Sequence, residues 1–192
     1  MMGASIMELM KTPVGKFRWF KCLGNARKAY DAGKPDEWTL DFFLDSSDPS
    51  TQKWIDSMET KFGELFGTAA KKSPYWFNCN PDDKEDGFYK IKFKKTCWVN
   101  DNGVKTEPAN VIDSKLQKWP IDKEIGNGSK GRIAYKINTW SKNGASGMTL
   151  DPMKIMIMDY VPYEGGSIPS DDEVFGVVEG GFSLEQEAEK AF

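Results

Sequence analysis

The sequence predicts a mainly β protein with one α-helix, arranged as a small barrel or sandwich. Short runs rich in aromatic and β-branched residues recur along the chain, with turn residues between them, and one segment has the spacing of an amphipathic helix. The 192 residues suit one domain of ordinary size. A composition that is 39% hydrophobic and 13% aromatic can form a core, which excludes global disorder.

Strands are predicted where apolar and polar side chains alternate. In chain order the predicted strands are 17–22, 38–44, 88–99, 104–112, 130–140 and 153–161. The 104–112 strand is the least regular, because Pro108 marks an edge or a break within it. Asn100-Asp101-Asn102-Gly103 predicts a hairpin turn, 71–87 a loop and 141–147 a flexible turn.

The predicted helix covers about residues 49–67. Asp48 supplies an N-cap, Pro49 a first helical residue and Gly67 a stop. Between these signals, apolar side chains recur at spacings of four, four and three: Trp54, Met58, Phe62 and Leu65. An oligonucleotide-binding barrel and a generic β-sandwich both fit five or six strands with one helix, and the pattern alone does not separate them.

The absence of histidine narrows the possible chemistry. It excludes Ser-His-Asp catalysis, Cys-His catalysis and His-containing zinc sites, so no catalytic residue, metal or cofactor is expected. Cys22, Cys79 and Cys97 form no CxxC pair and are interpreted as reduced thiols. The acidic cluster at 82–86 lacks calcium-loop spacing, which favours a solvated loop over a metal-dependent nuclease site.

The net charge of −3 is the sum of two oppositely charged parts. Residues 159–192 contain nine acids and one base and carry −8, which leaves +5 for residues 1–158. A basic body with an acidic end is typical of nucleic-acid contact and an interaction tail, although such acids can also serve solubility alone. The chain shows neither an apolar run of membrane-spanning length nor a secretory signal, so an intracellular protein is expected.

Two predicted strands carry rows of cations. Lys92 and Lys94 share one face of the 88–99 strand with Lys90, about 6.5 to 7 Å apart, which roughly matches the phosphate repeat of an extended single strand. The alternative is a solvated barrel exterior. On the 130–140 strand one face holds three cations and a tryptophan, and a further lysine follows: Lys130, Arg132, Lys136, Trp140 and Lys142.

Cations beside aromatic rings suit single-stranded nucleic acid, because its unpaired bases expose their π-faces for stacking. Trp140 is the first stacking candidate, with a core position as the alternative, and Trp19 is the second. Residues 75–77, Tyr-Trp-Phe, fit either a lid or a packing plug. Residues 164–192 are predicted to form a flexible tail that binds partners through seven residues: Asp171, Asp172, Glu173, Glu185, Glu187, Glu189 and Phe192.

The ordered motifs of residues 12–166 resemble those of the single-stranded DNA-binding proteins of short-tailed lytic bacteriophages. The matching stretches are Thr12-Pro13-Val14-Gly15, 38–49 with Trp54 and Met58, Ile91-Lys92-Phe93-Lys94, Asp113-Ser114-Lys115, 126–130 with Tyr135, and 143–147. The resemblance implies an oligonucleotide-binding barrel over 1–163 that binds single-stranded DNA without sequence preference. It carries site roles onto Lys92, Lys94, Lys115 and Lys130, and places Trp140 where the family has a stacking tyrosine.

The resemblance also implies partners and a setting. These are the phage DNA polymerase and helicase-primase, bound through the tail, a homodimer formed by tail exchange, and the cytoplasm of the infected bacterial host. The shorter tail and the reduced 71–87 loop depart from the family pattern. A different class of function, an adaptor that presents the Phe192 tail to a partner enzyme, fits the same sequence.

Overall fold

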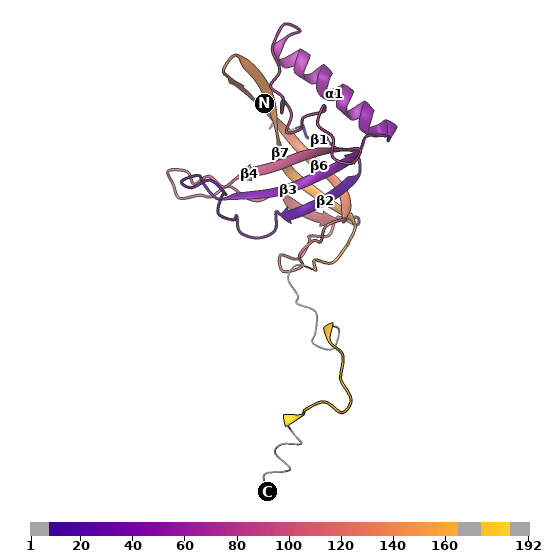
Figure 1. Ribbon diagram of the computed structural model, residues 1–192. Coiled ribbons are helices and arrows are strands. Elements are labelled where there is room, and N and C mark those ends of the chain that lie inside the picture. Colours follow the sequence, from indigo (N-terminus) through magenta and orange to yellow (C-terminus); the bar gives the residue numbers. More distant parts are fainter. Residues whose placement is uncertain (1–7, 165–173, 185–192) are drawn as a thin grey trace.

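The computed structural model describes residues 8–164 and 174–184. Its elements are β1 (Met10–Lys11), β2 (Gly15–Lys21), β3 (Glu37–Asp45), α1 (Pro49–Phe66), β4 (Phe88–Thr96), β5 (Asn110–Asp113), β6 (Lys130–Lys142) and β7 (Ala145–Asp159). The strands form one sheet in the order β4-β3-β2-β6-β7-β5, and β1 pairs with β6. All pairs are antiparallel except β5 with β7. Figure 1 shows β2, β3 and β4 crossing over β6 and β7, with α1 outside the strands.

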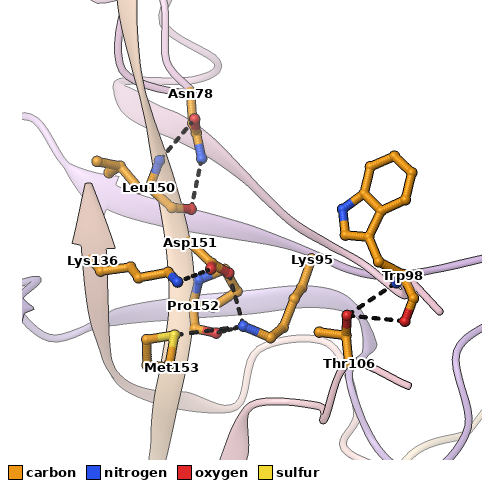
Figure 2. Close-up of polar contacts among 9 residues, drawn as sticks. All are labelled: Asn78, Lys95, Trp98, Thr106, Lys136, Leu150, Asp151, Pro152 and Met153. Carbon is orange, nitrogen blue, oxygen red and sulfur yellow. Dashed lines mark hydrogen bonds and ion pairs between the residues drawn. The ribbon is translucent and has the colours of Figure 1, made fainter. Parts of the chain in front are cut away.

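The sheet curls until β4 approaches β7, and residues 71–80, called here the seam segment, fill the gap between them. The Lys92 N–H donates to the Asn78 carbonyl over 3.0 Å, and the Met148 N–H donates to the Trp76 carbonyl. The side-chain amide of Asn78 exchanges two bonds with the backbone of Leu150, at 3.2 and 3.3 Å (Figure 2). The seam segment therefore bonds to β4 on one side and β7 on the other, which closes a barrel and excludes a two-sheet sandwich.

A buried ion pair links β4 and β7 a second time. Lys95 lies on the core-facing side of β4 and is only 8% exposed. Its Nζ is 3.0 Å from Asp151 Oδ1 on β7, while Asp151 Oδ2 is 3.5 Å from Lys136 Nζ on β6 (Figure 2). One carboxylate thus balances two ammonium groups, and one of those groups is desolvated.

The helix prediction is confirmed at both ends. Asp48 Oδ1 accepts a hydrogen bond from the Ser50 N–H at 2.8 Å, and Gly67 caps the other end with a φ of 83°. Inside the barrel, the Trp54 indole N–H donates to the Tyr135 hydroxyl over 2.9 Å. Burial raises the pKa of Tyr135 to about 12, so its hydroxyl stays protonated near neutral pH. The hydrogen bond between Trp54 and Tyr135 links α1 to the core.

One predicted turn and two predicted strands needed correction, and longer-range pairing explains each. The 141–147 turn is only Asn143-Gly144, with φ values of 53° and 78°, because β6 and β7 continue pairing up to this two-residue hairpin. The 104–112 strand shortens to β5, which pairs in parallel with β7. Residues 104–106 instead pair back onto 98–100 around the predicted hairpin turn, so β4 ends at Thr96.

The three cysteines are free thiols, as the sequence predicted. Burial raises the pKa of both Cys22 and Cys79 to about 12, so these two thiols remain protonated near neutral pH. Among the residues that the structure describes, no helix has the length and apolar character needed to cross a membrane.

Candidate nucleic-acid interface

The outer face of β4 carries the first predicted row of cations. Tyr89, Ile91 and Phe93 are buried in the barrel, so the alternation of the strand directs Lys92 and Lys94 outward. Lys90 lies on the same side of the strand. The burial pattern thus matches the face assignment made from the sequence, and it leaves the two predicted lysines exposed to solvent.

Lys92 and Lys94 line a cavity of about 520 Å³ together with Trp140, and we call this cavity the Trp140 groove. Its remaining lining residues are Thr39, Asp41, Tyr75, Asn78, Phe93 and Thr149. Three predicted site residues, which lie up to 48 positions apart in the sequence, therefore line one cavity. Ammonium groups that can contact phosphates lie there beside two aromatic side chains that can stack on bases.

Trp140 is positioned by a glycine on the neighbouring strand. It pairs with Gly147 across the β6–β7 ladder, and a Cβ atom at Gly147 would overlap the indole ring. The indole therefore packs closely against Gly147 and is half-buried, which limits the rotamers available to it. A ring held in this way loses little conformational entropy when a base stacks on it.

Residues 75–77, predicted to be either a lid or a packing plug, do not share one role. Trp76 and Phe77 are buried in the core, so they are a packing plug. Tyr75 is 52% exposed and lines the Trp140 groove, which makes it a further stacking candidate beside Trp140. The aromatic run alone contained no signal to separate these roles, because the seam segment has no regular alternation.

Two cations missed by the sequence reasoning extend the same outer surface. Lys16 and Arg18 lie on β2 on either side of the buried Phe17. The register aligns Arg18 with Asp41 on β3, and Asp41 with Lys92 on β4. The alternation of 16–18 was visible in the sequence, but the pairing of β2 with β3 and β4 was not.

Arg18 has an aromatic and an acidic partner. Its guanidinium lies 4.9 Å from the centre of the Phe43 ring. Its Nη1 is also 3.3 Å from Glu85 Oε1. A cavity of about 200 Å³ opens beside it, lined by Lys16, Phe17, Arg18, Phe43, Glu85, Asp86, Phe88 and Gly128. We call this the Arg18 cavity.

The other predicted cations of β6 lie outside the Trp140 groove. Lys130 is exposed and pairs with Lys16 across the β2–β6 ladder, near the Arg18 cavity. Arg132 donates from Nε to the Thr12 carbonyl over 2.9 Å, and Lys136 is engaged by Asp151. The face predicted from 130 to 140 is thus divided by contacts that only the tertiary structure creates.

The remaining predicted residues are dispersed. Trp19 is 57% exposed at a β-bulge with a φ of 51°, and its N–H donates to Asn127 Oδ1 over 2.8 Å. Lys115 is exposed in the turn that follows β5, and Lys142 is exposed beside the β6–β7 turn. The seven predicted tail residues lie outside the described residues: Asp171, Asp172, Glu173, Glu185, Glu187, Glu189 and Phe192.

Two phage proteins are similar to this chain in sequence, although no family model matches it. The single-stranded DNA-binding protein of Enterobacteria phage T3 is 25% identical over 189 residues, which cover 85% of this chain and 78% of the T3 protein. That of Escherichia phage T7 is 25% identical over 174 residues, 79% of this chain and 73% of the T7 protein. The resemblance predicted from the sequence is confirmed.

Solved structures of such phage proteins share the fold. The crystal structure of gp2.5, a single-stranded DNA-binding protein encoded by bacteriophage T7, aligns with a TM-score of 0.62 at 15% identity, over 86% of this chain and 99% of gp2.5. The bacteriophage Enc34 single-stranded DNA-binding protein, solved in complex with single-stranded DNA, aligns with a TM-score of 0.59 at 12% identity, over 81% and 88%. The predicted oligonucleotide-binding barrel is therefore confirmed as the fold.

Proposed function

We propose that this protein binds single-stranded DNA without sequence preference and serves phage DNA replication and recombination. The observation that carries the proposal is the Trp140 groove, in which exposed Lys92 and Lys94 adjoin Trp140 and Tyr75. Unpaired bases can stack on the rings while their phosphates contact the ammonium groups, and neither contact reads sequence. The relatives from phages T3 and T7, which are named single-stranded DNA-binding proteins, support the DNA-binding part of the proposal. It requires no catalytic step and no cofactor.

The first test measures how salt changes the affinity. Oligo(dT) is titrated against tryptophan fluorescence at several salt concentrations, and the logarithm of the binding constant is expected to fall linearly with the logarithm of salt concentration. Lys92→Gln is expected to weaken binding and to reduce the slope by about 0.7, the value for one phosphate contact on a single strand. Lys53→Gln, at an exposed position on α1, is the matched control and should change neither quantity.

Binding that is indifferent to salt would contradict the proposed function. An equal reduction of the salt slope in Lys92→Gln and Lys53→Gln would show that the effect comes from overall charge and not from the groove. A competition between oligo(dT) and oligo(U) reports the preference for DNA over RNA, which depends on contacts to the 2′-hydroxyl.

We propose a partner-binding role for the acidic segment 164–192. Its charge supports contacts with basic surfaces of the phage polymerase and helicase-primase, and exchange of the segment between two copies would form a homodimer in the cytoplasm of an infected bacterium. A chain lacking residues 167–192 is expected to bind oligo(dT) as tightly as the full chain or more tightly, because an anionic competitor is removed. If DNA binding is absent and the deletion abolishes the only measurable partner binding, the protein is an adaptor instead.

A further inference from the structure

One carboxylate lies between two cations of the outer barrel face. Glu85 Oε1 is 3.3 Å from Arg18 Nη1, and Glu85 Oε2 is 3.5 Å from Lys90 Nζ. Arg18 belongs to β2 and Lys90 to β4, so the carboxylate spans the sheet over β3. All three side chains remain partly exposed and border the Arg18 cavity or lie next to it.

The backbone holds Glu85 in this position. Glu85 and Phe88 exchange two hydrogen bonds of 2.9 Å across a two-residue turn, in which Asp86 and Gly87 have φ values of 50° and 81°. Such a turn fixes the direction of the residues that flank it. The Gly87 carbonyl also accepts from the Ser46 N–H over 3.0 Å, which attaches the turn to the end of β3. The acidic cluster expected to be a solvated loop thus presents one acid to the basic face.

A guanidinium and an ammonium that converge on one pair of oxygens are a suitable site for a phosphodiester. Arg18 is aligned through Asp41 with Lys92, which lines the Trp140 groove. Two strand spacings separate Arg18 from Lys92, or about 10 Å, so a single DNA strand can reach both. The Phe43 ring beneath the guanidinium keeps it oriented toward the cavity.

We propose that Arg18 and Lys90 form a second phosphate-binding subsite for single-stranded DNA, which Glu85 occupies until a backbone phosphate displaces it. This inference rests on the proposed function and adds a subsite and its competitor to it. Displacement breaks the two exposed ion pairs of Glu85 and forms two phosphate contacts in their place, while Asp41 Oδ2 remains 4.0 Å from Lys90 Nζ. Glu85 therefore lowers the affinity for single-stranded DNA and reduces the salt dependence that these cations would otherwise contribute.

The experiment compares two changes of equal charge in one loop. Glu85→Gln is expected to tighten oligo(dT) binding roughly two- to tenfold at low salt, which corresponds to the loss of exposed ion pairs, and to steepen the salt slope. Asp83→Asn is the matched control, because Asp83 makes no ion pair with any residue that the structure describes. The control is expected to change the affinity less than twofold. Equal effects of the two variants would overturn the subsite.

A second comparison tests the competition directly. Arg18→Gln is expected to weaken binding more in the Glu85→Gln background than in the wild type, because only there is Arg18 fully available to phosphate. Equal losses in the two backgrounds would overturn the displacement. Failure of the wild-type protein to bind oligo(dT) would instead overturn the proposed function itself, so the two failures are distinguishable. Circular dichroism and the thermal midpoint verify that each variant is folded.

Discussion

Replacing Trp140 with alanine is expected to weaken oligo(dT) binding by about 1–3 kcal/mol, the usual contribution of one stacked base. This corresponds to an increase in Kd of roughly five- to 150-fold. The indole is half-buried in the groove beside Lys92 and Lys94, so its loss removes a preformed stacking surface next to the phosphate contacts. Tyr30→Ala is the control, because Tyr30 is fully exposed and does not line the groove.

The substitution Gly147→Ala tests the same contact without removing the tryptophan. A methyl group at this position overlaps the indole of Trp140 and must displace it. Binding is therefore expected to weaken, and the fluorescence change on DNA addition to decrease, although the number of tryptophans is unchanged. An oligo(dT) Kd for Trp140→Ala within twofold of the wild-type value would show that Trp140 is not a stacking residue.

The largest effect on stability is expected from Asp151→Ala. This change leaves the buried Lys95 ammonium without a carboxylate, and its remaining contacts are the Pro152 carbonyl at 3.4 Å and the Met153 sulfur at 3.5 Å. An uncompensated buried charge of this kind costs about 3–5 kcal/mol. Urea denaturation is expected to show a free energy of unfolding that is lower by about this amount.

Substitution of the partner residue, Lys95, should lower the free energy of unfolding by less, because the geometry of the network is asymmetric. In Lys95→Met the carboxylate of Asp151 keeps Lys136 at 3.5 Å, so no charge is left unpaired. Methionine also retains most of the apolar side-chain volume. A Lys95→Met variant that is less stable than Asp151→Ala would contradict the proposed asymmetry. Lys95→Met should leave Lys92 and Lys94 in place on the outer face, because Lys95 lies on the core side of β4.

Local pattern was sufficient for most of the secondary structure. The alternation of Tyr89, Ile91 and Phe93 with lysines defined both faces of β4, because a strand directs successive side chains to opposite sides. Asp48, Pro49 and Gly67 located the ends of α1, because capping is an interaction between near neighbours. These features depend on contacts within a few residues, so they can be read from the chain without knowing the fold.

Predictions that depended on distant pairing were less complete. The length of β7 follows from its ladder with β6, and β5 is held by a separate parallel ladder with β7. No local pattern indicates either pairing. The row from Lys130 to Trp140 was predicted as one binding face. In the barrel, Arg132 and Lys136 acquire partners from elsewhere in the chain, and only Trp140 reaches the groove. Strand twist and curvature separate residues that alternation alone places together.

Composition and local spacing were enough to identify the residue types of the interface, the lack of histidine, the division into a basic body and an acidic end, and the family resemblance. Which of these residues lie together became known from the folded barrel alone. Closure of the barrel through Asn78 places Lys92 and Lys94 beside Trp140, and the β2–β3–β4 register places Arg18 and Lys90 on either side of Glu85. Composition and spacing are properties of the chain, whereas a groove is a property of strands that the chain brings together from distant positions.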